Sequence, residues 1–351
     1  MDNLKLAHKN AKKGKGWYKE VEMIDNDEEK YLTILQEQLK SLSYETSEYT
    51  IFDKVEGNKL REIYKLPYFP DRICQWALLQ VIEPTLMKQL VRDTYSAIPG
   101  RGIHIALERI SKAVKYDRDN TKYCLKLDIK KYYPNINHDI LKGIYRRIFK
   151  DPKLLWLIDE IIDSTEGNKG IPIGNYMSQW SGNLYLSPFD HWMKEVQGIK
   201  YYFRYMDDIV ILHESKEYLH QLKKEIDAYL KEVLDLELKD NWQVFPVAVR
   251  GIDYLGYRIF PDFILLRKTT VKNIKRRVKQ INKYLEANDI ITHNQWSSLN
   301  SYNGWLIYCN SYRLQKKYII PLKGEMEKFY KEVIKNENSR YANRSIEIRA
   351  G

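Results

Sequence analysis

The most informative stretch of the sequence reads Tyr201-Tyr202-Phe203-Arg204-Tyr205-Met206-Asp207-Asp208-Ile209-Val210-Ile211-Leu212. Its two outer runs are rich in aromatic and β-branched residues, which favour strands. Asp is a common turn residue, and the two aspartates stand between these runs. The stretch therefore predicts a β-hairpin whose turn carries Met206, Asp207 and Asp208.

A third aspartate follows another strand-like segment. Cys124-Leu125-Lys126-Leu127-Asp128-Ile129 alternates apolar and polar residues, as a half-buried strand does. Adjacent carboxylates repel each other, so a set of three makes sense where a cation neutralises them. Carboxylate oxygens suit Mg²⁺, and two such ions activate a hydroxyl and hold a triphosphate. A plain turn role for Asp207 and Asp208 remains the alternative at this stage.

The composition indicates a nucleic-acid partner. The chain has 351 residues, a formal net charge of +11 and a hydrophobic share of 44%, which suits a globular protein of two or three subdomains with a basic surface. Three widely separated cysteines suit a reducing cytosol, and the lysine-rich N-terminus lacks the apolar core of a signal peptide. No run is long enough to span a membrane. We therefore expect a cytoplasmic protein without a membrane partner.

Helical patterns alternate with the predicted strands. A sheet with helices on one face follows from this order, so the expected fold class is α+β. The expected helices cover residues 28–42, two stretches within 72–114, and residues 137–163, 176–195 and 216–234, and a further strand pair is expected within 251–260.

A strongly basic helix is expected near residues 265–283, which include no acidic residue. Val271, Ile274, Val278 and Ile281 recur at helical spacing and predict one buried face. The other face is cationic and would contact nucleic-acid phosphates, although a solvated charged face is the alternative. The residues that we expect to bind nucleic acid are Lys272, Lys275, Arg276 and Lys279.

Five segments, in this order along the chain, resemble the conserved motifs of reverse transcriptases. Residues 127–134 are similar to motif A, residues 170–179 to motif B, residues 203–208 to motif C, residues 236–239 to motif D and residues 251–257 to motif E. With a looser match in the fingers, the resemblance covers about residues 55 to 260.

The resemblance implies a right-hand polymerase fold with helical fingers, an antiparallel-sheet palm and a short helical thumb. The N-terminal extension and fingers would cover residues 1–120, and the palm residues 121–263, with 137–170 partly in the fingers. Residues 264–335 would form the thumb and 336–351 a flexible tail. The resemblance further implies that the protein is an RNA-directed DNA polymerase.

The resemblance also assigns the metal site. Asp128, Asp207 and Asp208 would hold two Mg²⁺ ions, with the Ile129 carbonyl as an extra ligand and Mn²⁺ as a substitute metal. Lys239 in motif D would protonate the pyrophosphate as it leaves.

Five further residues would surround the incoming nucleotide. The Tyr133 ring would act as a steric gate against a ribose 2′-hydroxyl, and Ile173 would lie against the nucleotide. Gly174 would allow a close main-chain approach, and Ser178 and Gln179 would follow on a helix beneath the template. For each position, ordinary packing, a turn or a helix start is the alternative.

The segment Lys59-Leu60-Arg61-Glu62-Ile63 is similar to the part of the fingers that binds the triphosphate. Arg61 is expected at the γ-phosphate, because a guanidinium binds phosphate oxygens in a bidentate manner. Lys59 is the second basic residue of this segment, and a surface role for both is the alternative.

Motif B refines the resemblance. Many family members carry Gln-Gly followed by Ser-Pro, whereas this chain has Ile173-Gly174 and Ser178-Gln179, a form typical of diversity-generating retroelement reverse transcriptases. Such an enzyme would copy a template RNA with errors at adenines, using dNTPs, a DNA or RNA primer and a small helical oligomeric accessory protein.

Other readings compete with this one. An antiphage-defence or otherwise unclassified reverse transcriptase is the nearest, and a retron or group II intron enzyme fits motif B less well. An inactive RNA-binding scaffold would have no reason to keep three repelling carboxylates together. A basic DNA-binding protein lacks support, since no helix-turn-helix or zinc finger is evident.

Overall fold

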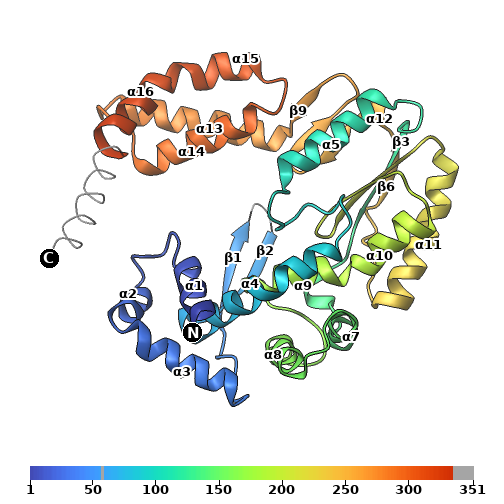
Figure 1. Cartoon of the computed structure of the whole chain (residues 1–351). Helices are drawn as coiled ribbons and strands as arrows, with labels where there is room; N and C mark the ends of the chain where they lie inside the picture. Colours follow the sequence, from blue (N-terminus) through green and yellow to red (C-terminus); the bar gives the residue numbers. More distant parts are fainter. Residues whose placement is uncertain (57–58, 335–351) are drawn as a thin grey trace. The chain divides into compact units, whose positions relative to one another are not determined.

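The computed structural model describes residues 1–56 and 59–334, and the predicted tail at 336–351 lies outside them. The chain separates into two units (Figure 1). The first contains Met1–Ala106 and Tyr123–Phe245, and the second contains Leu107–Lys122 and the chain from Pro246 onward.

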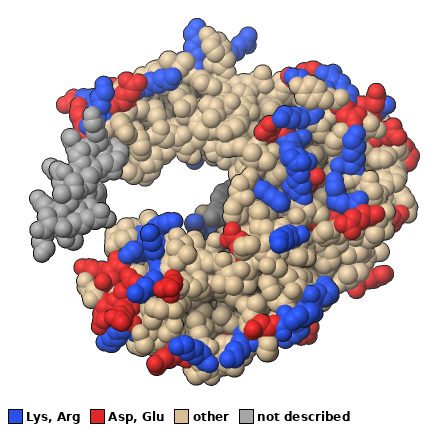
Figure 2. Space-filling model, viewed as in Figure 1, with Lys and Arg blue, Asp and Glu red and all other residues tan. Residues whose placement is uncertain are grey.

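Three helices begin the first unit: α1 (Asp2–Ala11), α2 (Lys19–Asn26) and α3 (Glu28–Lys40). The helix expected from residue 28 is thereby confirmed. In α1, Leu4, Ala7 and Ala11 recur every three or four residues and are buried, and the helix packs on α4 (Ile73–Lys88). On the face in Figure 2, the N-terminal helices expose acidic and basic side chains intermixed.

An antiparallel hairpin follows, formed by β1 (Thr50–Glu56) and β2 (Lys59–Lys65). It carries the basic segment that resembles the triphosphate-binding part of the fingers. A π-helical turn, η1 (Tyr68–Arg72), then leads into α4.

The central sheet has the order β4-β5-β3-β6. Its strands are β3 (Tyr123–Asp128), β4 (Tyr201–Tyr205), β5 (Asp208–His213) and β6 (Gln243–Pro246). The predicted hairpin is confirmed, because β4 and β5 pair antiparallel with Tyr205 opposite Asp208. Apolar residues of β3 and β5 are buried, and α11 (Lys216–Leu234) packs on both strands.

The remaining helices of this unit are α6 (Tyr132–Asn135), α7 (His138–Ile148), α8 (Pro152–Ile162), α9 (Tyr176–Tyr185), α10 (Ser187–His191) and η2 (Trp192–Val196). The expectation of one helical stretch over 137–163 was wrong. Phe149 is extended, and the Asp151 side chain accepts the Leu154 amide to start α8 with proline in its first turn. A proline there loses no helical hydrogen bond, which favours a new start.

The second unit has a three-stranded antiparallel sheet, β7 (Ile252–Tyr254), β8 (Tyr257–Ile259) and β9 (Ile264–Leu266). Its helices are most of α5 (Ile103–Tyr116), then α12 (Val247–Arg250), α13 (Lys268–Leu285), α14 (His293–Leu306), α15 (Tyr312–Leu314), η3 (Gln315–Ile319), η4 (Ile320–Leu322), α16 (Lys323–Phe329) and η5 (Tyr330–Ile334). In α13, Ile274, Val278 and Ile281 are buried as expected.

Candidate active site

Two aspartates stand opposite each other on neighbouring strands of the central sheet. Strands β3 and β5 pair antiparallel, and their register places Asp128 directly opposite Asp208. Directly opposed side chains of a strand pair lie about 4.5–5.5 Å apart at Cβ, and like charges there are destabilising. The register of β3 and β5 therefore concentrates negative charge at this end of the sheet.

The third aspartate occupies the turn between β4 and β5. Met206 holds φ at 54°, in the left-handed region that residues with a side chain rarely adopt. The Ile129 amide donates a hydrogen bond to the Asp207 carbonyl oxygen at 3.3 Å, which ties the turn to the end of β3. A strained turn held in this way is typical of functional sites.

The environment of the carboxylates disfavours their negative charge. Burial raises the pKa of Asp208 to about 6; Asp128 and Asp207 add to the increase, while Lys126 opposes it. Burial and the neighbouring Asp128 also raise the pKa of Asp207. The negative charge of Asp207 and Asp208 is therefore disfavoured, and a bound cation would offset this.

Two lysines already supply positive charge at the site. The Lys239 ammonium forms an ion pair with Asp128, and the Lys126 ammonium lies 3.6 Å from Asp208. The backbone fixes Lys239 in place, because its amide donates to the Asp128 carbonyl at 2.8 Å. The predicted proton-donor role of Lys239 stays a prediction, and it would require this ion pair to open.

The donor set fits the two Mg²⁺ ions that the family implies. Asp128 and Asp208 stand opposite each other at one end of the sheet, and Asp207 occupies the adjoining turn, so all three can offer hard carboxylate oxygens there. The lysine ammonium groups pair with Asp128 and Asp208. Ligation by the Ile129 carbonyl stays a prediction.

Within the described residues, a trio away from the aspartates also has a spacing that a metal ion could use. The potential ligand atoms of His8, Asp25 and Glu28 lie within 4.8 Å of one another. Lys12 pairs with Asp25 at 2.7 Å, and the Tyr68 hydroxyl contacts His8 Nδ1 at 2.9 Å. These partners explain the cluster without a metal.

A buried ion pair supports the hairpin turn from below. Arg204 of β4 and Asp190 of α10 are both fully buried, with Nε and Nη2 of the arginine 2.7 and 2.5 Å from the carboxylate oxygens. Arg204 Nη1 also donates to the Met206 carbonyl at 3.0 Å. Tyr202 and Thr94 donate to the same carboxylate. Arg204 is therefore a positioning residue for the turn that carries Asp207.

The predicted gate residue lies against the same turn. The Tyr133 hydroxyl is 3.6 Å from the Met206 sulfur, and the ring is half-buried against α9. Burial and the nearby Asp207 raise the pKa of Tyr133, whereas the positive charge of Arg61 opposes this. The structure thus brings Tyr133 to the aspartates, with Arg61 close enough to act on it. The gating role itself stays a prediction.

The segment that resembles motif B docks on the β1–β2 hairpin. The Tyr64 amide of β2 donates to the Ile173 carbonyl at 2.9 Å. Gly174 has φ of 133°, and a Cβ there would collide with the Tyr64 carbonyl oxygen. This close approach requires glycine. The structure therefore explains the glycine at position 174 by its contact with the β2 backbone, which the sequence-based interpretation as a nucleotide contact did not foresee.

Other predicted nucleotide-binding residues lie around this contact. Arg61 and Ile173 line one pocket of ≈ 760 Å³ between the hairpin and the motif B loop. On α9, Ser178 is buried and Gln179 is exposed, and the side chain of Lys59 lies outside the described part of the structure. Nucleotide contacts by these residues stay predictions.

The predicted nucleic-acid contacts belong to the second unit. On α13 the side chains of Lys272, Lys275, Arg276 and Lys279 are all exposed. Lys275 also lies over the Tyr318 ring, with its nitrogen 5.7 Å from the centroid. Binding of nucleic acid by this face stays a prediction.

Sequence reasoning missed the supporting residues of the site. A single arginine within the apolar strand 201–205 signals a buried charge, but its partner Asp190 lies on a helix with no sequence cue. Lys126 in the polar phase of β3 was also overlooked. Only the pairing of β3 with β5 shows that it reaches Asp208.

Comparison with known families identifies the class. Residues 53–259 match the family model described as reverse transcriptase (RNA-dependent DNA polymerase). The match covers more than half of the chain, so the chain belongs to the reverse transcriptase family, and its enzyme class is RNA-directed DNA polymerase. The helices and antiparallel sheets of the structure confirm the predicted α+β fold class.

Two curated relatives are similar to this chain. Protein YkfC of Escherichia coli (strain K12) is 22% identical over 270 residues, covering 65% of this chain and 71% of that protein. The group II intron-encoded protein LtrA of Lactococcus lactis subsp. cremoris is 26% identical over 260 residues, covering 69% of this chain and 41% of LtrA. The chain thus matches less than half of LtrA.

Solved telomerase structures also resemble the chain. Apo telomerase from Candida tropicalis, truncated from the C-terminal domain, has a TM-score of 0.48 at 13% identity, covering 63% of this chain and 55% of that one. Telomerase from Candida albicans in complex with a TWJ fragment of telomeric RNA has a TM-score of 0.49 at 12% identity, covering 69% of this chain and 52% of that one. Among the described helices, none has the length and apolar character needed to cross a bilayer.

Proposed function

We propose that this chain extends a DNA or RNA primer on an RNA template by two-metal nucleotidyl transfer at Asp128, Asp207 and Asp208. The observation that carries this proposal is the β3–β5 register, which opposes Asp128 and Asp208 beside the turn that holds Asp207. Two bound Mg²⁺ ions would activate the primer 3′-hydroxyl and stabilise charge on the triphosphate.

The residues of the chain then have distinct tasks. The three carboxylates hold the metals, and the Arg204–Asp190 pair fixes the turn below Asp207. Arg61, on the exposed hairpin, binds the triphosphate, while the Tyr133 ring selects the sugar.

Replacing a single carboxylate tests the metal site. Asp207→Ala should abolish primer extension, because the two-metal arrangement needs the full donor set. RNA affinity should survive, since it rests on dispersed basic contacts. Asp139→Ala, which removes an exposed carboxylate at the start of α7, serves as the control. Extension by Asp207→Ala at the rate of the control would refute the assignment.

We further propose that the enzyme belongs to a diversity-generating retroelement and works in the cytoplasm with a small helical oligomeric accessory protein. Motif B supports the subtype, because Ile173-Gly174 and Ser178-Gln179 replace the Gln-Gly and Ser-Pro of many relatives. The three free cysteines suit a reducing compartment.

Sequencing the RNA that co-purifies with the protein, together with the cDNA made from it, tests the subtype. A diversifying enzyme should yield cDNA with substitutions concentrated opposite template adenines. Errors spread evenly over the four template bases would instead favour a defence or other reverse transcriptase.

A further inference from the structure

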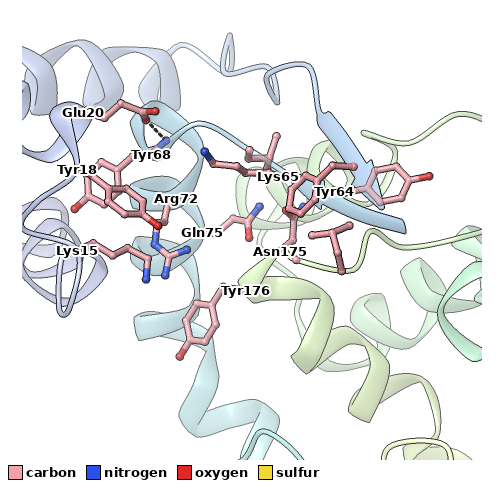
Figure 3. Close-up of a pocket in the computed structure, with 14 residues that line it drawn as sticks. Lys15, Tyr18, Glu20, Tyr64, Lys65, Tyr68, Arg72, Gln75, Asn175 and Tyr176 are labelled. Atoms are coloured by element: carbon pink, nitrogen blue, oxygen red, sulfur yellow. Dashed lines mark hydrogen bonds between the residues drawn. The ribbon is translucent and has the colours of Figure 1, made fainter. Parts of the chain in front are cut away.

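A second pocket lies on the other side of the Ile173–Gly174 loop. It has a volume of ≈ 210 Å³ and is lined by the N-terminal segment, β2, the start of α4 and the motif B loop. Figure 3 shows Lys15 and Tyr18 from the N-terminal segment and Arg72 and Gln75 from the α4 region around the same space. Lys15 and Tyr18 precede residues 53–259, so they lie outside the part that matches the family model.

Three basic side chains, Lys15, Lys65 and Arg72, line this pocket, and two of them, Lys15 and Arg72, act on each other. The pKa of Lys15 is lowered, first by the positive charge of Arg72 and then by burial. Within residues 1–56 and 59–334, the groups acting on either cation include no carboxylate. The acid that lines the pocket, Glu20, instead accepts the Tyr68 amide at 2.5 Å. Three basic side chains against one carboxylate leave the pocket lining with a net positive charge, which favours an anion.

A buried amide also points to a ligand. Gln75 is only 2% exposed, and its Oε1 accepts the Met177 amide at 3.2 Å. Its Nε2 is buried and has no hydrogen-bond partner in the described chain. A buried donor left without a partner is destabilising, and buried polar groups are nearly always hydrogen-bonded, so this donor is available to a ligand.

Aromatic rings complete the lining. Tyr176 stacks on Trp76 with ring centroids 4.5 Å apart and an interplanar angle of 27°. Tyr18, Tyr64 and Tyr176 are half-buried and line the pocket. Rings beside cations suit a ligand with a planar base and a phosphate, because bases stack on aromatic side chains.

We propose that this pocket binds a nucleotide unit, with its phosphate at Lys15 and Arg72 and a hydrogen bond from Gln75. The unit comes either from a single-stranded nucleic acid, as a phosphodiester, or from a free nucleoside phosphate. Binding here is independent of catalysis at the three aspartates, and so of the proposed function.

Equilibrium binding in EDTA tests this pocket, because chelation removes metal-supported binding at the aspartates. Two probes distinguish the sources: ATP, and a fluorescein-labelled single-stranded oligoriboadenylate. Lys15→Gln should weaken binding of at least one probe about tenfold, as expected for one charge-assisted contact. The matched control is Lys13→Gln, an exposed lysine of the same segment that does not line the pocket. It should change affinity less than about twofold.

A second variant tests the amide. Gln75→Glu keeps an acceptor for the Met177 amide but exchanges the free donor for a negative charge, so it should also weaken binding. Because this charge is buried, the melting temperature should fall, and binding is measured well below it. Loss confined to the oligonucleotide assigns a strand, and loss confined to ATP assigns a free nucleotide. Equal affinities of Lys15→Gln and Lys13→Gln for both probes, with Gln75→Glu unchanged, would overturn the proposal. Primer extension in Mg²⁺ reports separately on the proposed function.

Discussion

Tyr133 owes its position to a few contacts of its ring. The ring packs beside Gly182 of α9 and meets the Met206 sulfur, so the hairpin turn and α9 fix its orientation. Because burial raises the pKa of its hydroxyl, the group stays protonated near neutral pH. Its bulk, and not a charge, is therefore what a nucleotide sugar would meet.

Tyr133→Ala should admit ribonucleotides. Removing the ring opens space for a 2′-hydroxyl, and steric discrimination of this kind is worth about 10- to 200-fold. The measurement is the ratio of kcat/KM for dNTP to that for rNTP. Tyr133→Phe is the control and should keep the ratio, since it retains the ring. If the ratio is the same in the alanine variant, Tyr133 is a packing residue only.

Ile173 is the residue-scale test of fidelity. Its side chain is half-buried in the pocket that Arg61 also lines, while its carbonyl is held by the Tyr64 amide. An apolar side chain discriminates by only about 1–3 kcal/mol, whereas a hydrogen-bonding group rejects misfits more strongly. Template adenine should suffer most, because its pair with thymine has only two hydrogen bonds. Ile173→Gln should therefore reduce errors opposite template adenine severalfold.

The control for Ile173→Gln makes the same chemical change elsewhere in the pocket. Ile51 of β1 is 51% exposed and lines it too, so Ile51→Gln should leave the errors unchanged. Both variants keep the backbone bond to Tyr64, so the loop should stay docked. Sequencing cDNA from one template compares them, and equal adenine error rates in active Ile173→Gln and wild type would exclude the role.

At the scale of elements, the β4–β5 hairpin depends on the buried Arg204–Asp190 pair. Removing one partner of such a pair leaves an uncompensated charge and costs about 3–5 kcal/mol. Arg204→Met should lower the free energy of unfolding by about this amount. Denaturant unfolding measures it.

A double variant separates stability from positioning. Arg204→Met combined with Asp190→Asn leaves no buried charge, so much of the lost stability should return. The hydrogen bond to the Met206 carbonyl stays absent, so kcat should remain low while the KM for dNTP changes little. A double variant that recovers kcat together with stability would show that the pair has no positioning role.

The elements that carry the motifs were predictable because each has a strong local pattern. The apolar runs of β3, β4 and β5 and the helical repeats of α11 and α13 appear in the sequence itself. The hairpin β1–β2 is different, because its strands are largely exposed and alternate weakly. Isolated hairpins gain stability from partners, and here β2 bonds to the distant Ile173. Such a long-range contact has no local signal.

At the scale of the whole molecule, the three aspartates could be predicted from the sequence, whereas the side chains that pair with them and hold them in place could not. The three aspartates could be grouped because each follows a strand in a recognisable motif. Their lysine partners depend on strand register and on the path of residues 237–239 beside β3, which pairing alone determines. The pocket at Lys15 joins segments about 160 residues apart in the sequence, from the N-terminal segment to Tyr176, so only the folded chain reveals it.

The chain has a net charge of +11, so the question is whether its affinity for nucleic acid comes from one basic face or from the overall charge. If α13 contacts phosphates, neutralising Lys275, Arg276 and Lys279 together should weaken template–primer binding and flatten its salt dependence. Each lost contact should lower the slope of log K against log salt by about 0.7 to 0.9. The control is the equally charged triple substitution of Lys216, Lys224 and Lys231, exposed lysines of α11. A general charge effect would lower affinity equally in both variants. A change of slope confined to the α13 variant would identify its basic face as the contact, because counterions are released only where phosphates are bound. Equal slopes in the α13 and α11 variants would show that the α13 face is only solvated.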